Sequence, residues 1–127
     1  MLDAFTTTTA GVGKSTLAVH LAVWLFDRGF RVAVLDCDKQ RSSSQWIAEA
    51  EPKITVRTSS SPESTLLEAR ILLRTHDFVI GDGPGGLDDL SRTLLILADL
   101  AILPISPSIL DIRSVSQATS ILRYAQE

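Results

Sequence analysis

Short apolar runs alternate along the whole chain with longer segments in which apolar residues recur at helical spacing. The short runs are typical of strands buried on both faces, and the longer segments are typical of amphipathic helices. Strands are expected at residues 2–6, 31–35, 54–56, 77–82 and 100–105, with 54–56 at the edge of the sheet. This alternation predicts an α/β fold with a mostly parallel sheet and helices on both faces, in three α/β/α layers.

Helices are expected at residues 13–27, 42–50, 63–75, from Asp88 or Asp89 to 98, and at 108–124. The first helix places Leu17, Leu21 and Leu25 at four-residue spacing, with Ala18 and Ala22 beside them, which predicts an apolar face on this helix. Serines 42–44 are expected to cap the second helix. The run 83–86, Gly-Pro-Gly-Gly, is expected to be a loop. Trp24 and Trp46 are expected in the core or at an interface, and the amphipathic last helix on the sheet.

A glycine-rich turn lies between the first expected strand and the first expected helix. Glycines there let the backbone curl around a phosphate, and the free N–H groups of a helix N-terminus bind that anion. A lysine at this point adds charge toward the β- and γ-phosphates, and the hydroxyl after it can bind Mg²⁺. The predicted phosphate-binding residues are Gly11, Val12, Gly13, Lys14, Ser15 and Thr16. The strict P-loop pattern also needs a glycine at position 8, where this chain has Thr8.

Three aspartates follow expected strands. Asp36 and Asp38 come after the strand 31–35, and Asp82 ends the strand 77–82. Ligands of open α/β sheets bind beyond the carboxyl ends of the strands, so these carboxylates are expected beside the phosphate-binding turn. There they can hold Mg²⁺ or orient an attacking water.

Length and composition limit the other functional classes. The 127 residues suit one compact domain, 45% of them are hydrophobic, and the net charge of −3 gives no general attraction to nucleic acid or anionic lipid. No apolar run is long enough to cross a bilayer, which predicts no membrane association. The single cysteine, Cys37, allows no intrachain disulfide and is expected to be a small buried residue. A cytoplasmic location is the simplest expectation.

Four blocks, in this order, make the chain similar to the ParA/MinD family of P-loop ATPases, and most similar to the partition proteins of the ParA type. They are AGVGKSTLA at 10–18, GFRVAVLDCDKQ at 29–40, DFVIGDGPG at 77–85 and ADLAILPISPS at 98–108. The resemblance implies a P-loop NTPase fold and binding of ATP or ADP with Mg²⁺. It also implies a homodimer that forms on ATP binding, a partner protein of the ParB type and non-specific DNA binding.

The resemblance also implies roles for individual residues. Lys14 would contact the β- and γ-phosphates and act with Asp38, which would position the attacking water. Ser15 would bind Mg²⁺, and Asp36 and Asp82 would support its coordination shell. On this basis residues 1–127 are expected to form a single nucleotide-binding domain that lacks the C-terminal part of the family fold.

The chain departs from the family pattern at several positions. Thr9 and Ala10 stand where the family has its signature lysine and a glycine, and Lys39 replaces a proline. Asp3 and the threonines 6–9 make the first strand unusually polar. Because threonine carries no charge, the alternative to a partition ATPase is a nucleotide-binding module with impaired hydrolysis. A structural or interaction remnant and a relative of the amide-forming or carboxylating synthetases also stay open.

Overall fold

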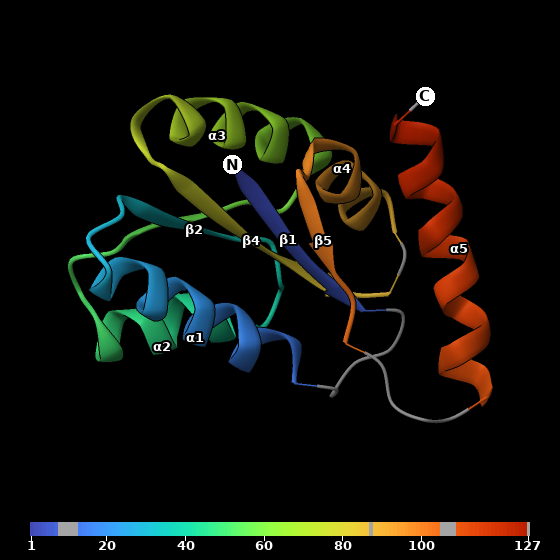
Figure 1. Ribbon diagram of the computed structural model, residues 1–127, viewed down its shortest axis with the longest axis horizontal. Coiled ribbons are helices and arrows are strands. Elements are labelled where there is room, and N and C mark those ends of the chain that lie inside the picture. The colour runs from blue at the N-terminus through green and yellow to red at the C-terminus, as the bar shows by residue number, and fades with distance from the viewer. Residues whose placement is uncertain (8–12, 87, 105–108, 127) are drawn as a thin grey trace.

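A parallel five-stranded sheet forms the centre of the protein (Figure 1). The computed structural model describes residues 1–7, 13–86, 88–104 and 109–126. The strands are β1 (Leu2–Thr7), β2 (Val32–Asp36), β3 (Thr55–Thr58), β4 (Phe78–Gly85) and β5 (Leu100–Ile102). They lie in the order β3-β2-β4-β1-β5, and every paired neighbour is parallel. The predicted α/β class and the edge position of the third strand are confirmed.

Helices cover both faces of this sheet. They are α1 (Lys14–Asp27), α2 (Ser42–Ala50), α3 (Pro62–Thr75), α4 (Asp89–Leu97) and α5 (Ile109–Gln126). In Figure 1, α1 and α2 lie on one face, and α3 and α4 lie on the other. Alternate residues of the strands therefore enter two cores. Val34 and Ile80 pack toward α1, while Leu35 and Val79 pack toward α3 and α4.

The predicted loop at residues 83–86 is wrong, because β4 continues to Gly85 and Thr7 pairs with Gly85. The glycines have a packing role in this strand. A Cβ atom at Gly83 would lie 3.1 Å from the Phe5 carbonyl oxygen and 3.1 Å from Leu94 Cδ1 of α4. The absence of a side chain thus lets α4 approach the strand closely.

Helix starts differ from the prediction in one case and agree in another. The serines 42–44 do not cap α2, whose N-cap is Arg41 in a left-handed conformation with φ of 56°. The expected cap at Asp88 is confirmed, because its carboxylate accepts a hydrogen bond from the Ser91 N–H at 2.9 Å.

The face of α1 that packs on the sheet is centred on small residues and not on the row of leucines. Ala18, Val19, Ala22 and Leu25 are buried, whereas Leu17 is 47% exposed. The expected apolar face is thus buried at Ala18, Ala22 and Leu25, and it leaves Leu17 outside the core. Small alanines let α1 lie close to the sheet, and the larger side chains move to its flank. There they line an open apolar groove of about 360 Å³ formed by Phe5, Leu17, His20, Leu21, Trp24 and Ile102.

The two tryptophans lie at the surface. Trp24 and Trp46 are 51% and 44% exposed, so neither belongs to the core. Arg28 stacks over the Trp24 ring at 3.5 Å.

The last helix, α5, lies beside α4 rather than on the sheet, which corrects its expected position (Figure 1). Its Ile121 and Leu122 are half-buried.

The polar first strand is deeply buried. β1 lies between β4 and β5, and Asp3 is only 4% exposed. Among the residues described, the Asp3 Oδ1 and Thr6 Oγ1 atoms have no hydrogen-bond partner. Burial raises the pKa of Asp3, and the neighbouring Asp99 raises that pKa further. A buried carboxylate of this kind costs stability in its charged form.

We expect Asp3→Asn to stabilise the fold at pH 7 by about 1 kcal/mol, because the variant removes a buried negative charge. The folded-state pKa of Asp3 lies above its unfolded value of 3.8, so the wild type loses stability as pH rises above 3.8. The advantage of the variant should vanish below pH 3.8, where the wild-type side chain is protonated in both states. Urea unfolding across this pH range measures the difference.

The matched control is Asp77→Asn. Hydrogen bonds from Arg31 lower the pKa of Asp77, so its charged form stabilises the fold above its unfolded pKa. Asp77→Asn should therefore destabilise the protein at pH 7, opposite in sign to Asp3→Asn. Equal behaviour of the two variants would contradict the assignment of a buried, unfavourable charge to Asp3.

Candidate nucleotide-binding site

The start of α1 lies at the carboxyl edge of the central strands. Gly13 precedes the helix with φ of 82°, in the left-handed region that glycine adopts without strain, and its carbonyl accepts the Leu17 N–H at 3.1 Å. Lys14 and Ser15 form the first turn, followed by the exposed Thr16. Two predicted phosphate-binding residues, Gly11 and Val12, lie outside the described residues, as do Thr8, Thr9 and Ala10.

Four predicted site residues meet at this edge. The buried Lys14 Nζ forms a salt bridge with Asp82 Oδ1 and lies 3.4 Å from Asp38 Oδ2. The Ser15 hydroxyl donates to Asp82 Oδ2 at 2.9 Å and accepts from Lys14 Nζ at 3.2 Å. The structure thus confirms that the helix start and the strand-end aspartates lie together.

Strand register explains why these residues converge. Asp36 and Asp82 are paired positions on β2 and β4. Both continue the side of their strand that carries Val34 and Ile80, the side covered by α1. Since side chains alternate along a strand, both carboxylates project toward the helix that begins with Lys14.

The electrostatics of Asp82 are dominated by burial. Its side chain is fully buried, and this desolvation raises the pKa of the carboxyl group. The positive charge of Lys14 opposes that shift, as do hydrogen bonds from Lys14 and from the Ser15 hydroxyl. Asp82 is therefore a buried carboxylate that needs a cation beside it to remain charged.

Asp36 is placed differently from Asp82. It is fully buried, and its carboxylate accepts backbone N–H groups from Asp38 at 3.1 Å and from Ser44 at 3.0 Å. Sequence reasoning missed these contacts, and it also missed Arg41. The Arg41 Nη1 donates to the carbonyls of Asp36 at 2.6 Å and Ser59 at 3.2 Å. An arginine at the start of an expected helix gave no signal for such a role.

The residues gathered here fit a magnesium ion. Ser15, Asp38 and Asp82 offer a hydroxyl and two carboxylates, the hard oxygen ligands that Mg²⁺ prefers, and they already surround a cation, the Lys14 ammonium. Among the described residues, no group of three or more His, Cys, Asp and Glu is arranged to hold a metal on its own.

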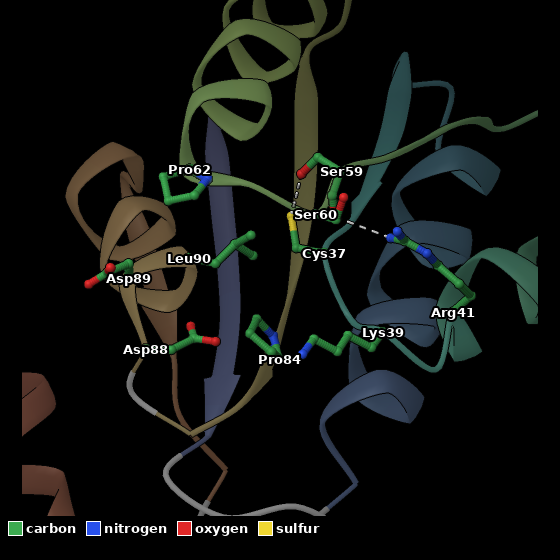
Figure 2. A pocket seen from close by; sticks show the side chains of 10 residues that line it. All are labelled: Cys37, Lys39, Arg41, Ser59, Ser60, Pro62, Pro84, Asp88, Asp89 and Leu90. Carbon is green, nitrogen blue, oxygen red and sulfur yellow. Dashed lines mark hydrogen bonds between the residues drawn. The ribbon is translucent and has the colours of Figure 1, made fainter.

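A cavity of about 290 Å³ lies beside the loop that contains Cys37, Lys39 and Arg41 (Figure 2). Its walls include Cys37, Lys39 and Arg41, with Pro84 and Leu90 from the opposite side. Cys37 is buried there, as predicted, and its Sγ lies 3.2 Å from the Ser59 hydroxyl. Burial raises the pKa of this thiol, which makes it a poor nucleophile.

Comparison with known families agrees with this geometry. Residues 3–121 match the family described as the CobQ/CobB/MinD/ParA nucleotide binding domain. The chain belongs to this family. The match includes Lys14, Ser15 and all three strand-end aspartates, so the clustered residues lie within a nucleotide-binding domain of the MinD/ParA type.

Individual relatives agree with the family. The chain is 29% identical over 124 residues to the maintenance of carboxysome distribution protein A of Halothiobacillus neapolitanus, covering 92% of this chain and 56% of that protein. It is 31% identical over 122 residues to the protein ParA of Rhizobium radiobacter, covering 92% of this chain and 54% of that protein. The chain thus spans about half the length of these curated relatives.

Solved structures show the same fold. The cell division ATPase MinD of Pyrococcus furiosus superposes with a TM-score of 0.78 at 19% identity, covering 98% of this chain and 67% of that one. A plasmid partition protein of Borrelia burgdorferi superposes with a TM-score of 0.74 at 16% identity, covering 99% of this chain and 74% of that one. The predicted P-loop fold is therefore confirmed. In the described part of the chain, no helix is long and apolar enough to span a membrane.

Proposed function

We propose that this domain binds ATP with Mg²⁺ and hydrolyses it to ADP and phosphate, as part of a partition or cargo-positioning protein of the ParA type. The observation that carries the proposal is the cluster of Lys14, Ser15, Asp38 and Asp82 at the start of α1. Each of these groups is of the type that phosphoryl transfer needs, and they meet at one point.

The residues divide the work by their chemistry. The α1 N-terminus and Lys14 bind the phosphates, because unpaired N–H groups and an ammonium both favour negative charge. Ser15 and Asp82 hold the magnesium, which supplies charge neutralisation on the phosphate oxygens when it is bound. Asp38, whose side chain is 17% exposed, is accessible to the attacking water and orients it. A role for Asp36 in the magnesium shell stays a prediction, and its hydrogen bonds to the backbone favour another role.

The relatives support the biological setting. One relative is a carboxysome distribution protein and another is a ParA protein, so cargo or DNA partition is the proposed process. A homodimer on ATP binding, a ParB-type partner, non-specific DNA binding and a cytoplasmic location belong to the same proposal.

A second candidate is nucleotide binding without effective hydrolysis. It is favoured by Thr9, which stands at the position of the family's signature lysine. The two candidates share the same bound ligand and differ in turnover alone.

A measurement of ATP turnover distinguishes the ATPase from a domain that binds nucleotide without hydrolysing it. Phosphate release is measured with wild-type protein, with and without DNA, over a range of protein concentrations. Hydrolysis that is lost in Asp38→Asn, while that variant still binds nucleotide, supports the ATPase. Tight nucleotide binding with no phosphate release from the wild type, followed by release from Thr9→Lys, would transfer support to the second candidate.

A further inference from the structure

The carboxylate of Asp36 is turned onto the backbone rather than onto the Lys14 ammonium. We propose that Asp36 is a positioning residue, which holds Asp38 and the first turn of α2 in place and does not enter the metal shell. The inference rests on the proposed function, because it assigns a role at the same site.

Both Asp36 oxygens already have a partner. Oδ1 accepts the Asp38 N–H at 3.1 Å, and Oδ2 accepts the Ser44 N–H at 3.0 Å. Hydrogen bonds from backbone N–H groups to a carboxylate are charge-assisted and stronger than neutral ones. In a fully buried residue they also compensate for the lost hydration of the charge.

The contact with Ser44 performs the work of a helix cap. The N-cap residue of α2, Arg41, makes no side-chain capping bond. Ser44 lies in the first turn of α2, where backbone N–H groups have no partner within the helix. Asp36 supplies the missing acceptor from the end of β2, and its negative charge also suits a helix N-terminus.

The main chain around Asp36 is tied in the same way. The Asp36 carbonyl accepts hydrogen bonds from Arg41 Nη1 at 2.6 Å and from the Ser59 N–H at 3.1 Å. The next residue, Cys37, donates its N–H to the Asp82 carbonyl at 2.8 Å. Hydrogen bonds from Cys37 and from Arg41 thus fix the first and last residues of the loop 37–41. Asp38 reaches Lys14 from this loop, and Cys37, Lys39 and Arg41 of the same loop line the cavity (Figure 2).

The Lys14 ammonium shows which oxygens face the cation. Its contacts within the described residues are Asp82, Asp38 and the Ser15 hydroxyl, and Asp36 is not one of them. Asp38 therefore reaches the reacting groups, and Asp36 acts on them through the backbone of Asp38.

The test compares Asp36→Asn and Asp36→Ala with Asp82→Asn. Three quantities are measured: the Mg²⁺ concentration that half-saturates binding of a fluorescent ATP analogue, the turnover number at saturating MgATP, and hydrogen exchange of the Asp38 and Ser44 amides by NMR. The Asn side chain keeps one oxygen acceptor and the Ala side chain keeps none, so a positioning role gives a graded response.

For the Asp36 variants we expect the half-saturating Mg²⁺ concentration to stay within about twofold of wild type, because no metal ligand is lost. Turnover should fall about tenfold in Asp36→Asn and about a hundredfold in Asp36→Ala, as is typical when a reacting group is displaced. The Asp38 and Ser44 amides should exchange faster in the same order. Asp82→Asn should raise the half-saturating Mg²⁺ concentration about tenfold, since it removes a charged ligand.

A rise in the Mg²⁺ requirement of Asp36→Asn equal to that of Asp82→Asn would overturn the inference, as would unchanged exchange at Asp38 and Ser44. Failure of the proposed function is a different result, because a wild type without turnover still gives the Mg²⁺ and exchange data. A wild type that binds no nucleotide refutes the proposed function, and the exchange data alone then decide on Asp36. If Asp36→Ala does not fold, Asp36→Asn carries the comparison.

Discussion

Lys14→Met is expected to weaken binding of ATP and ADP by about 100-fold. Among the described residues, Lys14 is the cation in contact with Asp38, Asp82 and Ser15, and a charge-assisted contact with phosphate contributes about 3 kcal/mol. Methionine matches the lysine side chain out to its ε carbon and lacks only the ammonium, so the change removes the charge with little loss of packing. Fluorescence titration with a nucleotide analogue, at fixed Mg²⁺, measures the dissociation constant.

The matched control is Lys53→Met, which makes the same change of charge at an exposed position between α2 and β3. Its nucleotide affinity should stay within about twofold of wild type, since exposed charges at a distance are screened by salt. Equal weakening by the two variants would show that net charge, rather than the Lys14 contact, determines affinity.

Lys14→Met should also destabilise the fold, by about 3 kcal/mol or more at pH 7. Lys14 is 8% exposed and Asp82 is fully buried, and removing one partner leaves the other as an uncompensated buried charge. Burial raises the pKa of Asp82 even beside Lys14, and the variant should raise this pKa further. The deficit of Lys14→Met should therefore grow as pH rises through the raised pKa that Asp82 has in the folded wild type, and vanish at lower pH, where Asp82 is protonated in both proteins.

A double-mutant cycle isolates the pair. In Lys14→Met with Asp82→Asn, no buried charge is left alone, so the double variant should be more stable than the sum of the two single changes implies, by about 1 kcal/mol or more. Urea unfolding of the four proteins gives the coupling free energy. Strictly additive effects would mean that Lys14 and Asp82 do not stabilise each other in the folded protein.

The residues of the site could largely be predicted because they belong to short sequence motifs that follow strands. Lys14 and Ser15 follow a glycine turn before a helix, and Asp36 and Asp82 end two buried strands. Parallel strands bring such ends to one edge, so the approach of Lys14 to Asp38 and Asp82 could be expected from topology. The roles of those residues needed more than topology.

What sequence patterns missed depends on contacts between distant segments. The extension of β4 through Gly83 and Gly85 contradicts local turn chemistry, and it follows from pairing with β1 and the close approach of Leu94. The exposure of Leu17 follows from the use of Ala18 and Ala22 as the contact face of α1. The alanines are visible in the local sequence, but which side of α1 faces the sheet is set by the strands that it packs against.

Asp36 shows the same limit within the site. A carboxylate after a strand looks alike in sequence whether it faces a metal or caps a helix. The difference lies in where the Ser44 N–H is held, eight residues farther along the chain. Such a contact is set by the tertiary path of the loop and by the Arg41 guanidinium that closes it.

The central claim is that the Lys14, Ser15 and Asp82 cluster binds a magnesium nucleotide. Isothermal titration of ADP into the wild-type protein and Lys14→Met, each with and without Mg²⁺, tests it most directly. The wild type should bind about one nucleotide per chain, more tightly with Mg²⁺ than without, and Lys14→Met should lose most of this binding while remaining folded by circular dichroism. A folded wild type that gives no binding heat, and no rise in melting temperature, with ADP or ATP in the presence of Mg²⁺ would contradict the claim.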